Sequence, residues 1–162
     1  MNRNTILAAS LLGTAALLCA GVAVPTAARA HDAHAHYSAG EPGNPKKPSR
    51  TVKVVMIEQG KKMLFEPSVI QVRKGEQIRF ILDNDGTEKH EFVLATHAAN
   101  LKHAEEMKRF PDMEHDDPNA KQLTPFTSSE ILWKFTKSGE FEYACLIPGH
   151  LEAGMLGKVI VK

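Results

Sequence analysis

The amino-acid sequence predicts an all-β domain, a sandwich or barrel of antiparallel strands interrupted by one short helical insertion. From residue 51 onward, apolar residues recur at every second position in several short segments, the pattern of a strand with one buried face. Turn-forming residues separate these segments at intervals typical of a sandwich or barrel. Between two of them lies a segment that lacks β-branched residues and is rich in Ala, Glu and Lys, which favours a helix.

The expected strands follow one another along residues 52–161. Turn signals at 59–61, 73–75, 83–86 and 137–139 separate several of them. In chain order, their buried faces are formed by Val52, Val54 and Met56; Ile70 and Val72; Ile78, Phe80 and Leu82; His90, Phe92 and Leu94; Ile131, Trp133 and Phe135; Phe141, Tyr143 and Cys145; and residues 158–161.

The helix is expected over residues 97–109. It should end before Phe110 and Pro111, because the residue that precedes a proline disfavours the helical conformation. A polar loop over residues 112–122 then returns the chain to the sheet. We therefore interpret this segment as an insertion between strands and not as a second domain, which also agrees with a total length of 162 residues.

Residues 1–30 have the pattern of a secretory signal peptide. Arg3 precedes an apolar run over 6–24, and Pro25 and the small residues Ala28 and Ala30 follow it. The alternative is a transmembrane anchor, but Gly13 and Gly21 dilute the run, and the small-residue ending favours cleavage after Ala30. We expect an exported, periplasmic protein with no membrane attachment after cleavage.

Residues 31–50 are expected to form a flexible, histidine-bearing tail that precedes the domain at 51–162. This segment contains three prolines, two glycines and almost nothing large and apolar, so it cannot bury enough surface to order itself.

Composition limits the classes of partner. The formal net charge is +1, or −1 after loss of Arg3 and Arg29, so nothing favours nucleic acid or an anionic membrane. The chain has only two cysteines, and cleavage would remove Cys19, which leaves Cys145 as a single thiol in an oxidising compartment. A lone thiol there is a liability unless something occupies it.

The segment from Cys145 to Met155 contains most of the candidate functional residues. A thiolate, the imidazole of His150 and a thioether on one loop are ligands that suit copper, whereas zinc has little use for methionine. His90 supplies a fourth donor, because it shares its buried strand face with Phe92, as Cys145 does with Phe141 and Tyr143. Two imidazoles, one thiolate and a weak axial methionine form a type 1 copper site.

This donor set argues against an enzyme, because protein atoms fill every coordination position and leave none open for a substrate. The alternative is a thiol hydrolase that uses Cys145 and His150. That reading leaves Met155 unexplained, and no Asn or Asp is obviously placed to orient His150.

Residues 141–162 (FEYACLIPGHLEAGMLGKVIVK) resemble the copper-ligand loop and last strand of the cupredoxins, with a C-x4-H-x4-M spacing similar to that of rusticyanin. Residues 65–75 (FEPSVIQVRKG) resemble an early strand and turn of that family. With the signal peptide, the tail and the insertion (HEFVLATH…MKRFPDMEHDDPN), the chain is most similar to the periplasmic copper-tolerance branch. The resemblance covers residues 52–162. It implies a Greek-key β-sandwich, one type 1 copper, and either one-electron transfer or copper handling.

One residue departs from the family pattern. Many cupredoxins follow the upstream histidine with Asn or Ser, whose side chain ties the two ligand segments together, but here Glu91 follows His90. Asp83 or Asn84 is a candidate for that role.

Further copper donors are candidates outside the main site. The tail offers His31, His34 and His36, although a solvated tail explains them equally well. The insertion offers His103 and Met107, which share a helix face with Phe110, and beyond them Met113 and His115; ordinary packing of that helix face is the alternative.

Two functions are compatible with a monomeric protein that holds one type 1 copper. One is one-electron transfer, with a role in copper tolerance and with a redox partner that docks on an apolar rim around His150. The rim would consist of Leu146, Ile147, Pro148, Leu151 and Leu156. The alternative is a copper buffer or chaperone with additional Met and His sites and no dedicated redox partner.

Overall fold

A computed structural model describes residues 37–110 and 117–162 of the protein. The expected signal peptide, the tail histidines His31, His34 and His36, and the candidates Met113 and His115 lie outside these residues. In the described part of the chain, no helix is long and apolar enough to span a membrane. The elements are β1 (Glu41–Pro42), β2 (Arg50–Gln59), β3 (Lys62–Glu66), β4 (Val69–Val72), β5 (Gln77–Asn84), β6 (His90–Ala95), α1 (His97–Arg109), β7 (Ala120–Leu123), β8 (Ser128–Lys134), β9 (Gly139–Ala144) and β10 (Leu156–Val161).

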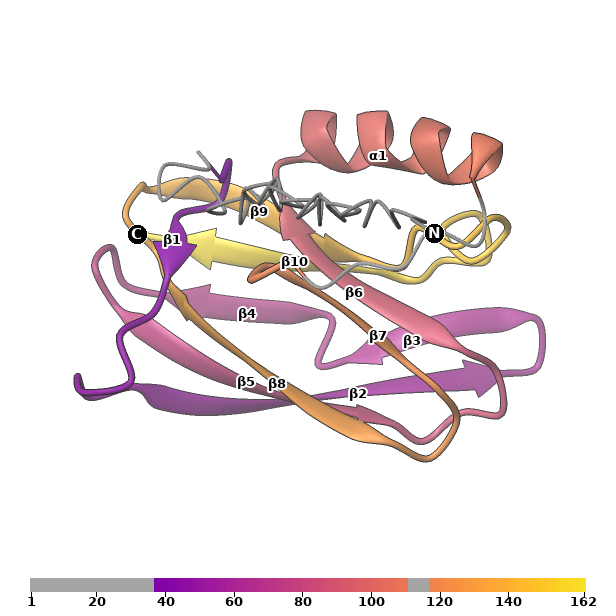
Figure 1. The fold of residues 1–162 in the computed structure, drawn as a ribbon, viewed down its shortest axis with the longest axis horizontal. Helices are drawn as coiled ribbons and strands as arrows, with labels where there is room; N and C mark the ends of the chain where they lie inside the picture. Colours follow the sequence, from indigo (N-terminus) through magenta and orange to yellow (C-terminus); the bar gives the residue numbers. More distant parts are fainter. Residues whose placement is uncertain (1–36, 111–116) are drawn as a thin grey trace, which may run out of the picture. The chain divides into compact units, whose positions relative to one another are not determined.

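The strands form two sheets of five strands each (Figure 1). One sheet has the order β1-β8-β5-β2-β3 and the other β4-β10-β9-β6-β7. Strands that follow one another in sequence therefore pass repeatedly from one sheet to the other, and the predicted all-β sandwich with one helical insertion is confirmed. The sheets are not wholly antiparallel as expected, because β2 pairs with β5, and β4 with β10, in parallel.

The two sheets share one apolar core. The side chains of β5 alternate between buried and half-buried from Ile78 onward, so Ile78, Phe80 and Leu82 face inward, as the sequence predicted. From the other sheet, the rings of Phe92 and Tyr143 stack with centroids 5.3 Å apart. This close-packed aromatic contact lies between the strands that end at the candidate site, so it restricts the movement of those strands.

Residues 37–50 differ from the expected flexible tail. Ala39 is fully buried, and its carbonyl oxygen accepts a hydrogen bond of 3.2 Å from the indole N–H of Trp133. β1 pairs with β8, and the Gln77 side chain accepts a bond of 2.7 Å from the Asn44 backbone N–H. The segment is ordered by contacts with distant residues, which its own composition does not reveal.

The sequence pattern did not predict strands β3 and β7. Part of β7 falls in the expected polar loop 112–122. β7 has a polar centre, Lys121 and Gln122, and pairs with β6 along His90–Val93. Backbone pairing with a central strand orders this segment despite its weak apolar pattern.

The predicted helix is confirmed with the expected bounds, 97–109. The Thr96 hydroxyl caps it by accepting a bond from the Ala99 backbone N–H. Met107 on the helix is buried in a cluster with Val93, Ala144 and Leu146, and the helix lies over the sheet that contains β6 and β9 (Figure 1). All six residues of β6 are therefore buried, so both faces of this strand are packed against other parts of the fold.

We predict that Met107→Ala lowers the free energy of unfolding by about 2–5 kcal/mol, because it leaves a cavity between α1 and the sheet. Denaturant unfolding of the metal-free protein measures this change. Leu101→Ala, on the same helix but with 47% of the residue exposed, should change stability by less than about 0.5 kcal/mol. Equal effects of the two substitutions would show that α1 is not anchored through Met107.

Candidate metal centre

The pairing of β6 with β9 brings His90 and Cys145 together. β6 begins at His90, β9 ends at Ala144, and the two strands run antiparallel with Val93 opposite Ala144. Cys145 follows the end of β9 directly, and its side chain and that of His90 are fully buried. Two residues that are 55 positions apart in the sequence thus meet at one end of the sandwich, as the strand pattern predicted.

The loop from Cys145 to Met155 supplies the second imidazole. The Cys145 backbone N–H donates to the Met155 carbonyl oxygen over 3.1 Å, which closes the loop at its base. Inside it, the Met155 N–H donates to the His150 carbonyl oxygen over 3.0 Å. These bonds hold His150 close to the end of β9. Met155 is fully buried in the main core next to this loop.

Three donor atoms converge at this point. The Nδ1 atoms of His90 and His150 are 3.2 Å apart, and Cys145 Sγ is 3.3 Å from His150 Nδ1. Within residues 37–110 and 117–162, His90, Cys145 and His150 form the only group of three or more His, Cys, Asp or Glu side chains arranged to hold a metal ion. His150 is the most exposed of them, at 7%.

The chemistry of these donors fits copper. Burial raises the pKa of the Cys145 thiol to about 12, and the Glu91 backbone N–H donates to its sulfur over 3.3 Å. Burial and the neighbouring His90 lower the pKa of His150, so this imidazole is neutral and its nitrogen lone pair can bind a metal. A soft sulfur and two imidazoles in a buried pocket are the donors that copper prefers.

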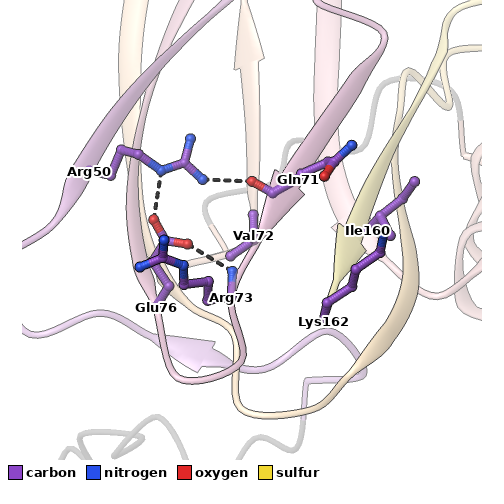
Figure 2. Close-up of a pocket in the computed structure, with 7 residues that line it drawn as sticks. All are labelled: Arg50, Gln71, Val72, Arg73, Glu76, Ile160 and Lys162. Atoms are coloured by element: carbon purple, nitrogen blue, oxygen red, sulfur yellow. Dashed lines mark hydrogen bonds and ion pairs between the residues drawn. The ribbon is translucent and has the colours of Figure 1, made fainter.

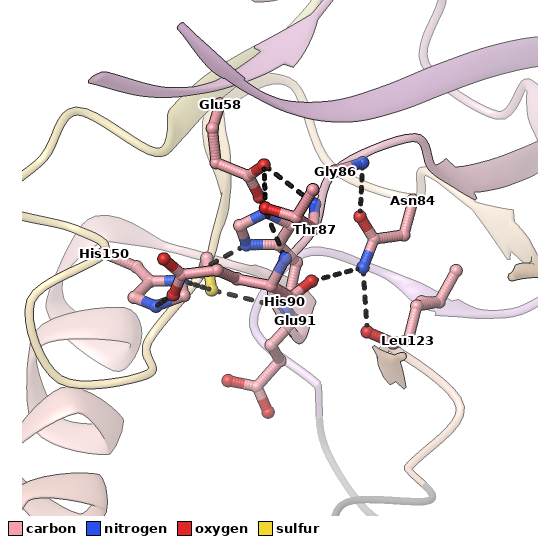
Figure 3. A network of polar contacts seen from close by, with 10 residues as sticks. Glu58, Asn84, Gly86, Thr87, His90, Glu91, Leu123 and His150 are labelled. Carbon is pink, nitrogen blue, oxygen red and sulfur yellow. Dashed lines mark hydrogen bonds and ion pairs between the residues drawn. The ribbon is translucent and has the colours of Figure 1, made fainter. Parts of the chain in front are cut away.

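Asn84 ties together the segments around His90, whereas the sequence made it a candidate for joining the His90 segment to the loop from Cys145 to Met155, and its side-chain bonds go elsewhere. Its side-chain nitrogen donates to the carbonyl oxygens of Glu88, at 2.8 Å, and Leu123, at 3.0 Å. Its side-chain oxygen accepts a bond from the Gly86 N–H (Figure 3). Asn84 therefore joins the end of β5, the loop before His90 and the end of β7.

Glu91 joins the two ligand segments themselves. Its side chain is fully buried, and burial raises the pKa of its carboxyl to about 7, against the opposing effect of hydrogen bonds from the Leu146 backbone and the Gln122 side chain. The bond of 3.3 Å from the Glu91 backbone N–H to the Cys145 sulfur connects the two segments. At this position the two segments are therefore connected through the backbone of Glu91.

Sequence reasoning missed two carboxylates beside the imidazoles. Glu58 Oε1 on β2 is 2.6 Å from His90 Nε2, and Glu88 Oε2 is 3.7 Å from His150 Nε2. Figure 3 shows the Glu58 side chain beside His90. No local pattern marks Glu58, because its position depends on how β2 lies against the loop before His90.

The helix covers part of the expected apolar rim. Leu146 is buried, and Leu151 and Leu156 are half-buried against the Met107 cluster. Pro148 is exposed next to His150. The secondary candidates His103 and Met107 share the helix face that packs on the sheet, which agrees with the packing alternative for Met107; copper binding there stays a prediction.

A separate surface pocket of about 550 Å³ lies at the opposite end of β10 from the ligand loop (Figure 2). Arg50 spans one side of it, with its guanidinium group bonded to the Glu76 carboxylate at 2.6 Å and to the Gln71 carbonyl oxygen at 2.7 Å. These bonds pair the charges of Arg50 and Glu76 within the fold. The lining residues are Arg50, Gln71, Val72, Arg73, Glu76, Ile160 and Lys162.

Two curated relatives match nearly the whole chain. A protein of Rubrivivax gelatinosus named copper-resistant cuproprotein CopI is 48% identical over 160 residues, which cover 91% of this chain and 95% of that protein. A protein of the same name from Pseudomonas aeruginosa is 33% identical, with the same coverage of the two chains.

Solved structures agree on the fold. Auracyanin from Roseiflexus castenholzii superposes with a TM-score of 0.60 at 21% identity, over 72% of this chain and 99% of that one. Auracyanin B also gives a TM-score of 0.60, at 23% identity, over 76% of this chain and 96% of that one. The model of the family described as copper binding proteins of the plastocyanin/azurin type matches residues 51–162. With its two-sheet sandwich and buried His, Cys and His side chains, the chain belongs to the plastocyanin/azurin family of copper-binding proteins, the cupredoxins.

Proposed function

We propose that His90, Cys145, His150 and Met155 hold one type 1 copper ion and that the protein takes up and releases one electron at this site. The observation that carries the proposal is the convergence of two Nδ1 atoms and one thiol sulfur in a buried pocket at one end of the sandwich. Copper supplies the one-electron redox couple when it is bound there.

The residues of this chain provide rigidity and a path for the electron. His90 and Cys145 are attached to paired strands inside a close-packed core, so their donor atoms move little when the charge at the site changes. The Glu91 N–H stabilises negative charge on the Cys145 sulfur. His150 is the donor side chain nearest to solvent, and we assign the passage of the electron to its exposed edge.

We propose an electron carrier and not an enzyme, because the four donors come from the protein and the pocket is almost closed to solvent. A redox partner would meet the edge of His150 near Pro148. We further propose that the protein acts as a monomer in the periplasm, in copper tolerance, since two relatives that match it along most of their length carry copper resistance in their names.

The alternative is a copper buffer or chaperone that uses additional Met and His sites. Among the described residues it would draw on His103 and Met107. The burial of Met107 among Val93, Ala144 and Leu146 favours packing for that residue, so we place this second function below the first.

Cys145→Ser should abolish the intense visible absorption of the copper-loaded protein, because that absorption needs a copper–thiolate bond. Absorption spectra after addition of Cu(II) measure this, and circular dichroism checks that the variant is folded. A folded variant that keeps the intense band would refute the assignment of Cys145.

Copper binding should release about one proton at pH 7, because the pKa of the Cys145 thiol lies near 12 in the metal-free protein and the copper ion displaces that proton. The apparent affinity should therefore rise about tenfold per pH unit and fall as the solution is acidified. Isothermal titration in two buffers of different ionisation enthalpy measures the number of protons released. Binding with no proton release would contradict a thiolate donor.

A strain that lacks the protein should grow poorly on excess copper and respire normally in ordinary medium. Complementation with the wild-type gene should restore copper tolerance, and complementation with Cys145→Ser should not. A respiratory defect without copper sensitivity would select electron shuttling as the main role instead.

A further inference from the structure

Glu58 makes a direct contact with the imidazole of His90. Its Oε1 atom lies 2.6 Å from His90 Nε2, on the side of the ring opposite the Nδ1 atom that faces His150 (Figure 3). His90 is fully buried, and the Glu58 side chain is 19% exposed. This contact joins β2 in one sheet to the first residue of β6 in the other.

The carboxylate is held by the loop that precedes His90. The Thr87 backbone N–H donates to Oε2 over 2.8 Å, and the Thr87 hydroxyl lies 3.2 Å from the same oxygen. The Glu88 backbone N–H donates to Oε1 over 3.3 Å. Backbone N–H groups only donate, so both oxygens of Glu58 are placed as acceptors.

The same loop is shaped to let the carboxylate approach. A Cβ atom at Gly86 would collide with Glu58 Oε1, so a larger residue at this position would displace the carboxylate. Asn84 holds Gly86 in place by accepting its N–H. Asn84, Gly86 and Thr87 together form a cradle for the carboxylate. The loop therefore holds the Glu58 carboxylate on one side, and His90 contacts it on the other.

The contact determines which nitrogen of His90 carries the proton. A carboxylate that accepts at Nε2 requires the N–H to be on Nε2, which leaves the lone pair on Nδ1, the atom that faces Cys145 and His150. Glu58 also adds a negative charge to the site. The thiolate and this carboxylate together balance the charge of Cu(II), whereas with Cu(I) they leave one excess negative charge.

We infer that Glu58 is a positioning residue that fixes His90 as an Nδ1 donor and favours the oxidised over the reduced copper. This inference rests on the proposed ligand role of His90. Three features support it: the short contact, the three donors that hold the carboxylate, and the glycine that makes room for it.

Replacement by glutamine tests the inference, because it keeps the size of the side chain and removes the charge. Glu58→Gln should weaken Cu(II) binding relative to Cu(I) by about tenfold, which corresponds to a reduction potential higher by about 59 mV for a one-electron couple. Competition titrations with Cu(I) and Cu(II) chelators and protein-film voltammetry measure the two quantities. Glu88→Gln is the charge-matched control: that side chain is 57% exposed and 3.7 Å from His150, so solvent screens it and the shift should be smaller.

A second readout needs no copper. In the ¹⁵N spectrum of the metal-free wild-type protein, the Nε2 atom of His90 should carry a slowly exchanging proton, and this proton should exchange faster in Glu58→Gln. Glu58→Asp keeps the charge but shortens the side chain, so its potential should lie between those of the wild type and Glu58→Gln. This variant and the wild-type spectrum decide the question if Glu58→Gln fails to fold.

The outcomes separate this inference from the proposed function. A folded, copper-binding Glu58→Gln with unchanged potential and unchanged Cu(II)-to-Cu(I) affinity ratio would overturn the role of Glu58 alone. So would a wild-type metal-free protein whose His90 is protonated on Nδ1. A wild-type protein that binds no copper, or a His90→Ala variant with an unaltered copper spectrum, would overturn the proposed function first.

Discussion

The antiparallel pairing of β6 with β9 is the constraint on which the metal centre depends. It sets Val93 opposite Ala144, and so places His90, at one end of β6, beside Cys145, which follows β9. Phe92 and Tyr143, on the same two strands, stack within the core, so a displacement of either ligand strand would disturb the packing between the sheets. The precision of the site is therefore a property of the sandwich, and the loop from Cys145 to Met155 has only to add His150.

Placing polar donors in an apolar core creates a need for hydrogen-bond partners, and the surrounding residues meet it. The second nitrogen of His90 contacts Glu58, the sulfur of Cys145 accepts from the Glu91 N–H, and Asn84 satisfies the carbonyl groups of Glu88 and Leu123. A buried polar group without such a partner destabilises the fold by about 1–3 kcal/mol. The polar residues around the site thus serve folding in the absence of metal, and the same contacts aim the donor atoms at one point.

The main strands and the group of His90, Cys145 and His150 could be predicted, because both depend on local patterns: alternation for Ile78, Phe80 and Leu82, and spacing for Cys145 and His150. The ordered structure of residues 37–50 could not be predicted, because Ala39 and Asn44 form hydrogen bonds with Trp133 and Gln77, which are far away in the sequence. The two parallel strand pairs and β7 were missed for the same reason: their partners are distant. Glu58 is the clearest case, because its contact requires β2, Gly86 and His90 to meet in the folded chain.

Helix α1 changes what a partner can reach. The insertion packs Met107 on Leu146, with Leu151 and Leu156 at the edge of the same cluster, so residues that would otherwise form an apolar rim instead anchor the ligand loop. Around the exposed edge of His150 there remain Pro148 and the carboxylate of Glu88. An electron carrier that serves a large partner benefits from a continuous apolar surface there, because the desolvated centre of an interface carries most of its binding energy. The helix therefore fixes the ligand loop and limits the apolar surface beside His150 that the proposed redox partner could contact.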